Sequence, residues 1–225
     1  MLFAAAQVPV VAPAHAQARD VCRNPFERPE ITVNLKARPE RTSSKLNSAE
    51  LYKVAGLLPS GYLHLGYTDM QRQFRVQAKV RDGTDPYGTY CYSPSEISVT
   101  VTVSPTIYIG TEYRGGTCPH DIIRLHEYRH LDIHERALRD LLADIERRLK
   151  YERQFFETRK ARDRKQAQAR VEAAAMEVVR AAAKDVDRAY RAQHLAMDTE
   201  ASYRANLGIC GAEAWGDLVE KLQRR

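Results

Sequence analysis

Two segments in the first half of the chain alternate apolar and polar residues one by one. The apolar members are Phe74, Val76, Ala78 and Val80 in the first segment and Ile97, Val99, Val101 and Val103 in the second. Because successive side chains of a strand point to opposite faces, this pattern predicts two half-buried antiparallel strands. Asp82-Gly83, a dipeptide that favours a turn, lies between them. Shorter runs predict strands at residues 31–35, 62–68 and 106–109 and a short helix at 48–55.

After residue 118 the apolar residues recur every three or four positions, which is typical of a helix that buries one side. One stripe runs from Ile122 to Leu149 and another from Val171 to Met197. Residues 157–168, between the stripes, are almost wholly charged or polar. The pattern permits one very long helix or two helices with a turn near residues 159–165. We expect the turn, because a lone helix would leave its stripe in water and an antiparallel return buries it.

The chain therefore divides into three segments. Residues 1–18 resemble an export signal, since an apolar run at residues 2–11 precedes two small-x-small cleavage sites, although no Lys or Arg precedes the run. A disordered apolar tail is the alternative. Residues 19–118 form a β-rich half, and residues 119–225 form a helical hairpin with a C-terminal tail. We expect one compact α+β domain, in which a small antiparallel sheet packs on the long antiparallel helical hairpin.

All four cysteines follow the expected cleavage site. An even number in an exported chain predicts two disulfides formed in an oxidising compartment, here the bacterial periplasm or the exterior. We prefer Cys91 with Cys118 and Cys22 with Cys210, because the first two flank the strands predicted just before the helix. Cys118 with Cys210 and Cys22 with Cys91 is a competing pairing, because an antiparallel hairpin also returns Cys210 towards Cys118.

The net charge of +6 would suit an anionic partner, but the basic residues are interleaved with acidic ones along the helices. A solvated charged surface explains most of them, and no nucleic-acid partner is expected. No segment after residue 18 approaches the length of apolar sequence that crosses a bilayer, so we expect no integral membrane protein after signal cleavage. The oligomeric state is left open.

His126, Glu127 and His130 form an H-E-x-x-H motif within the first helical stripe. Histidines four residues apart project from one side of a helix, so their ring nitrogens can bind one zinc ion. Glu127 lies next to these ligands without being one, and can accept a proton from the water that zinc activates. The alternative is a polar helix turn with two solvent or interface histidines.

A catalytic zinc ion takes three protein ligands, so a third is needed. His134 lies about 12 Å along the helix from His126, too far to join both histidines at one ion. If the second helix continues to about residue 206, a reversal near residue 162 places His194, Asp198 and Glu200 level with the motif. A continuous helix points Glu200 inwards, so we rank Glu200 first, Asp198 second and His194 third. Pairing of Glu200 with Arg204, four residues on, is the alternative.

The segment from His126 to Ile133 resembles the H-E-x-x-H-[FL]-D-I signature of a bacterial family of predicted secreted zinc-dependent proteases. The resemblance covers roughly residues 30–205 and includes Asp198-Thr199-Glu200, where the family has a D-x-E-T-like stretch. In that family a His-Gly pair soon follows, whereas this chain has Tyr203-Arg204. The resemblance implies a zinc site, and the hydroxyl of Tyr203 could stabilise a developing oxyanion.

These features predict an exported zinc-dependent hydrolase, a metallopeptidase acting on a peptide or protein with Glu127 as general base. Two alternatives belong to other classes. The first is a non-catalytic zinc-binding protein of the envelope, for which four protein ligands would be diagnostic. The second is a coiled-coil interaction protein, which would need neither the metal nor Glu127.

Overall fold

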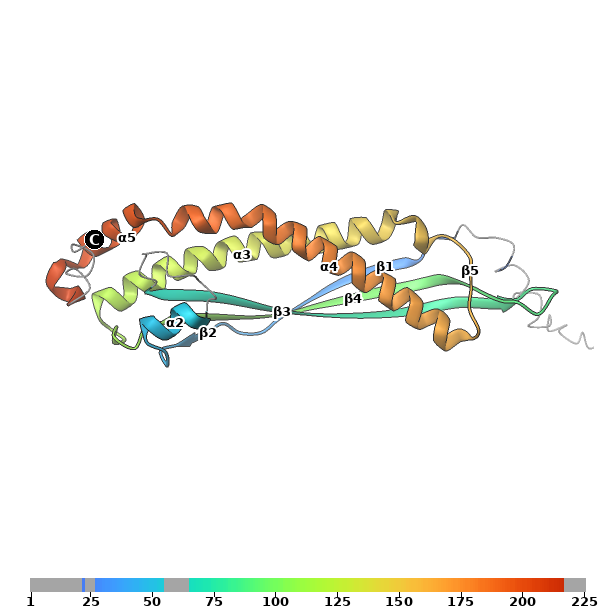
Figure 1. The fold of residues 1–225 in the computed structure, drawn as a ribbon, viewed down its shortest axis with the longest axis horizontal. Helices are drawn as coiled ribbons and strands as arrows, with labels where there is room; N and C mark the ends of the chain where they lie inside the picture. Colours follow the sequence, from blue (N-terminus) through green and yellow to red (C-terminus); the bar gives the residue numbers. More distant parts are fainter. Residues whose placement is uncertain (1–21, 23–26, 55–64, 217–225) are drawn as a thin grey trace, which may run out of the picture. The chain divides into compact units, whose positions relative to one another are not determined.

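The computed structural model describes Cys22 and residues 27–54 and 65–216. The expected export signal at residues 1–18 lies outside the described residues, as does the first part of the strand expected at 62–68. Figure 1 shows the elements in chain order. They are β1 (Glu30–Ala37), β2 (Arg41–Ser43), α2 (Ser48–Val54), β3 (Gly66–Thr84), β4 (Tyr90–Ile109), α3 (Cys118–Tyr151), the 3-10 helix η1 (Arg153–Phe155), β5 (Arg159–Lys160), α4 (Arg164–Met197), α5 (Glu200–Cys210) and the 3-10 helix η2 (Ala212–Trp215).

The fold combines helices and strands, as the sequence predicts. The two alternating segments lie in β3 and β4, and the long helical region is two helices of 34 residues each. The break between them, at residues 152–163, is confirmed, although it begins earlier than the sequence indicates. Phe155, in this break, is 1% exposed, so the chain leaves the helix while still burying an apolar side chain.

The sheet is centred on β4, which pairs with each of the other four strands. β5 runs antiparallel to it, with Cys91 opposite Lys160. β2 runs parallel to it, with Arg41 opposite Thr106, so the expectation of a purely antiparallel sheet is wrong. The chain passes from β2 to β4 through α2 and β3 rather than through a tight turn, and so its connection does not impose an antiparallel pair.

The chain forms two compact units, and both long strands and both long helices contribute to each. The first unit comprises residues up to Thr32 together with Val76–Val99 and Glu146–Val178. Its buried apolar side chains come from strands and helices alike, among them Tyr92, Ile97, Leu149, Phe155 and Val171. Strands β1 to β4 precede the boundary expected at residue 118 and both long helices follow it, while each unit contains strands and helices.

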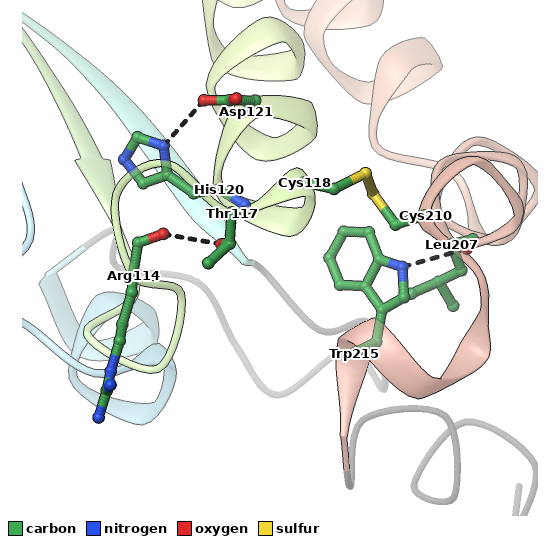
Figure 2. The surroundings of a disulfide bond; sticks show 8 residues. All are labelled: Arg114, Thr117, Cys118, His120, Asp121, Leu207, Cys210 and Trp215. Atoms are coloured by element: carbon green, nitrogen blue, oxygen red, sulfur yellow. Dashed lines mark hydrogen bonds and ion pairs between the residues drawn. A yellow bond between two sulfur atoms is a disulfide. The ribbon is translucent and has the colours of Figure 1, made fainter.

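The second unit comprises Val33–Arg75, Thr100–Ile145 and Val179–Arg225. One core cluster consists of Leu65, Ile107, Ile109, Tyr113, Ile123, Tyr203 and Trp215. A disulfide between Cys118 and Cys210 joins the start of α3 to the end of α5 (Figure 2). Beside it, the indole N–H of Trp215 donates to the carbonyl of Leu207 at 3.1 Å. The disulfide and this core therefore hold α5 against the helix that carries the H-E-x-x-H motif.

The disulfides follow the competing pairing, because Cys22 bonds to Cys91 and Cys118 to Cys210. The preferred pairing of Cys91 with Cys118 and Cys22 with Cys210 is wrong. β4 is one strand of 20 residues, about 65 Å long at the usual rise per residue, and it separates Cys91 near its start from Cys118 beyond its end. The sequence suggested shorter strands whose ends could meet.

Two disulfides are typical of proteins that fold in an oxidising compartment. Among the described residues, no helix combines the length and the apolar character needed to span a bilayer.

The Cys118–Cys210 disulfide predicts a measurable stabilisation of the second unit. Replacing both residues by Ser should lower the free energy of unfolding by about 2–4 kcal/mol, because the cross-link restricts the unfolded chain. Trp215 is the single tryptophan and is 4% exposed, so its fluorescence during urea unfolding reports on this region. The double Ser variant of Cys22 and Cys91 is the control, and should shift the Trp215 transition less. An unchanged midpoint in the first variant would contradict the stabilising role.

Candidate metal site

The two histidines of the motif lie one turn apart on α3 and face the same point. Their Nε2 atoms are 3.2 Å apart, and both side chains are buried in the second unit. The residues between and around them are helix formers, and the spacing of four positions makes the side chains neighbours.

Asp198 completes a cluster of three donor atoms. Its Oδ1 lies 3.1 Å from Nε2 of His126 and 3.0 Å from Nε2 of His130. The residue directly follows α4, where the chain leaves the helix before α5 begins. His126, His130 and Asp198 form the group among the described residues that could hold a metal ion.

The donor atoms of this cluster fit a small divalent cation. Tetrahedral zinc with bonds of 2.0–2.1 Å places its donors roughly 3.3 Å apart, close to the three separations of 3.0–3.2 Å found here. Protons satisfy the cluster less well, because two protonated ring nitrogens facing one oxygen would also face each other. Two imidazoles and a carboxylate are a known ligand set of catalytic zinc.

The surroundings keep Asp198 ionised. Burial raises the pKa of this carboxyl, but hydrogen bonds from His126 and His130 outweigh burial and hold the pKa below its usual range. The hydroxyl of Tyr203 also donates to Oδ1, at 3.1 Å. Asp198 therefore offers an anionic donor oxygen at neutral pH.

Glu200, expected first as third ligand, does not reach the histidines. Its Oε1 accepts hydrogen bonds from Nε and a terminal nitrogen of Arg204 at 2.8 and 2.5 Å, the alternative that the sequence allowed. The expectation assumed a continuous helix to about residue 206, but α4 ends at Met197. Thr199 caps α5 instead, accepting from the backbone N–H of Ser202, and this restarts the helical phase. Asp198, ranked second, takes the position.

His194, ranked third, lies outside the donor cluster and contacts His130. Its Nδ1 lies 2.9 Å from Nδ1 of His130, and the two rings are nearly parallel, at 13°, with their centroids 5.2 Å apart. Histidines that bind a metal through one nitrogen usually donate the other N–H to a neighbour, which fixes the ring. His194 has this position for His130, whereas Nδ1 of His126 is buried without a hydrogen-bond partner.

His134 packs against His194, with ring centroids 4.5 Å apart and the ring planes 43° apart. Burial, aided by the neighbouring His194 and Arg72, lowers the pKa of His134 to about 4. The imidazole is therefore neutral at physiological pH. As expected from its distance along the helix, His134 is outside the donor cluster.

Glu127 is buried beside the cluster, with 3% of its surface exposed. The hydroxyl of Thr68 on β3 donates to Oε2 of Glu127 at 2.8 Å and lies 3.0 Å from the backbone carbonyl oxygen of Glu127. Burial raises the pKa of Glu127 to about 7, whereas the charge of His130 and the hydrogen bond from Thr68 act to lower it. A carboxyl group with this pKa can both accept and return a proton near neutral pH.

Gly66, the first residue of β3, leaves the space that Glu127 occupies. A Cβ atom at this position would lie 2.8 Å from Cγ and Oε1 of Glu127 and 2.8 Å from Ile123. Sequence reasoning missed both Gly66 and Thr68. Nothing in their local pattern marks them, because they act only through the packing of β3 against α3.

Tyr203, whose hydroxyl the sequence suggested as an oxyanion stabiliser, lies at the cluster. It is 7% exposed, and its ring centroid is 5.4 Å from that of His126. Its position on α5 depends on the core around Trp215 and on the Cys118–Cys210 disulfide.

A pocket of about 370 Å³ opens onto the cluster. Its walls are the start of β3, the middle of α3 and the last turns of α4, and they include Glu127, His130 and Asp198. A molecule in this pocket can therefore reach His130, Asp198 and Glu127 from the same side.

The geometry predicts which carboxylate binds metal. Asp198→Asn and His126→Ala should each greatly reduce zinc bound per chain, because each removes one of three donors. Glu200→Gln is the matched control, and should bind zinc as the unchanged protein does. Zinc content after dialysis, measured by atomic absorption, distinguishes them. Loss of zinc in Glu200→Gln with retention in Asp198→Asn would reverse the assignment.

Comparison with known proteins does not extend this description. No protein-family model, no curated protein and no solved structure matches the chain. The function is therefore inferred from the site itself.

Proposed function

We propose that the chain is a zinc-dependent hydrolase, and specifically a metallopeptidase. One observation carries the proposal: three donor atoms converge next to a buried glutamate, and the glutamate and two of the donor residues line one open pocket. A structural zinc ion would instead be enclosed by four protein donors. The described residues offer three.

The proposed chemistry divides between the metal and the protein. Zinc at such a site supplies a Lewis acid that activates water towards a carbonyl carbon. Glu127 would accept the proton from the attacking water and return it to the leaving amine of a peptide. Its pKa of about 7 suits both steps, and Thr68 holds the side chain in place.

Tyr203 is proposed to stabilise the negative charge that develops on the substrate oxygen. Its hydroxyl is held at Oδ1 of Asp198, beside both histidines, and its ring is buried. Because a hydroxyl has one proton, it would turn from Asp198 to donate to the substrate oxygen, where the developing charge makes a stronger acceptor. His194, through Nδ1 of His130, would keep that imidazole turned towards the metal.

The proposal also covers the arrangement of α3 and α4 and the compartment in which the protein works. We propose that α3 and α4 form the expected antiparallel hairpin, which is supported by contacts that pair Asp140 with Tyr190 and His130 with His194. Export to the periplasm or the exterior is supported by the disulfides and by the composition of residues 1–18. The resemblance to secreted zinc-dependent proteases agrees with this function.

Replacing Glu127 by Gln tests the mechanism. The variant should retain zinc, because the coordination shell is intact, and lose at least about 100-fold in turnover, because the general base is removed. Release of peptides from fluorescein-labelled casein measures activity, and atomic absorption measures zinc. Loss of zinc would make Glu127 a ligand. Full activity would rule out its role as base.

Gly66→Ala tests whether the shape of the site positions the base. The added methyl group would displace Glu127, so kcat should fall about 10-fold or more while zinc content stays constant. Gly115→Ala is the control, because a Cβ atom there meets no atom within 4 Å. Equal activity of the two variants would show that Glu127 tolerates the displacement.

A further inference from the structure

A second, shallow and open hollow borders the pocket at the candidate metal site, between β3 and α4 of the second unit. This hollow, of about 460 Å³, shares Met70 and Asp187 with the pocket. We name the whole the β3–α4 groove, bounded by residues 66–74 of β3 and by the side of α4 from Arg180 to Asp198. The α4 residues that line it recur every three or four positions, as expected for one side of a helix.

The two walls of the groove have matching lengths. From Arg180 to Asp198, which directly follows α4, the rise is about 27 Å, and residues 66–74 of β3 extend about 26 Å. An extended peptide covers that distance with about eight residues. The groove thus starts at the metal site and has the length of a peptide segment.

The charges differ between the two ends of the groove. The metal end contains the carboxylates of Asp69, Glu127 and Asp198. At the other end Arg72 and Asp187 neutralise each other in an ion pair with nitrogen and oxygen 2.6 Å apart. Arg180 and Lys184 remain there, exposed and one helical turn apart, without a carboxylate partner among the residues that line this hollow.

We infer that the β3–α4 groove binds extended peptides that carry an acidic side chain about six to eight residues from the bond to be cleaved. Lys184 and Arg180 lie 14 and 18 residues from Asp198 along α4, which corresponds to about 21 and 27 Å. A carboxylate at that distance would reach both cations while the backbone passes the metal site. This inference rests on the proposed peptidase function and adds a preference to it.

The experiment compares two fluorescent peptides of about 12 residues. Two positions at one end are Glu in the first peptide and Gln in the second, and the rest of the sequence is the same. Binding is measured by anisotropy on zinc-loaded Glu127→Gln protein, and cleavage is measured on the unchanged enzyme. The Glu peptide should bind about 5- to 10-fold more tightly, and about 0.5 M salt should remove the difference. Reversing both charges, by Arg180→Glu with Lys184→Glu, should abolish the preference.

The control is Lys165→Glu, which changes charge on the same helix outside the groove and should leave the preference intact. Equal binding of the two peptides, or a preference that survives the double reversal, would overturn the inference. Binding of heparin that is lost in the double variant, without any peptide preference, would overturn it in favour of a polyanion. Preference for the Glu peptide without cleavage would support peptide binding in the groove and reject the hydrolase. Cleavage without that preference would support the hydrolase and reject the role of the groove.

Discussion

The contact of one Asp198 oxygen with Nε2 of both motif histidines is the interaction on which the candidate site depends. The backbone N–H of Asp198 still donates to the carbonyl of His194 at 3.2 Å, so Asp198 lies one turn beyond His194 on the side of α4 that faces His130. Glu200 lies beyond the end of α4, where Thr199 caps the next helix, and it pairs with Arg204. The side of α4 that carries His194 therefore supplies the carboxylate, and the end of the helix separates Glu200 from the site.

The sheet contributes to the site through β3. Thr68 donates to the carboxylate of Glu127, and Gly66 leaves room for that side chain. Burying a carboxyl group is costly unless it is hydrogen-bonded, and here the cost appears as a pKa raised to about 7. The strand thus helps to set both the position and the pKa of the Glu127 side chain.

The second side of the site is held by covalent and apolar contacts. Cys118 and Cys210 join α3 to α5, and Trp215 packs edge-on against Tyr113 with ring centroids 5.9 Å apart. These contacts fix α5, from which Tyr203 reaches Asp198. An oxidising compartment would favour this arrangement, because the disulfide forms there and persists.

The sequence by itself determined the features that depend on local spacing. The separation of His126 and His130 by four residues, the adjacent Glu127, the alternating strands and the two helical stripes all follow from the periods of helix and strand. Tertiary structure decided the rest: Asp198 in place of Glu200, the disulfide pairing, and the roles of Gly66 and Thr68. Each of these depends on where an element ends or on which distant element packs beside it, and such contacts leave no periodic pattern in the sequence.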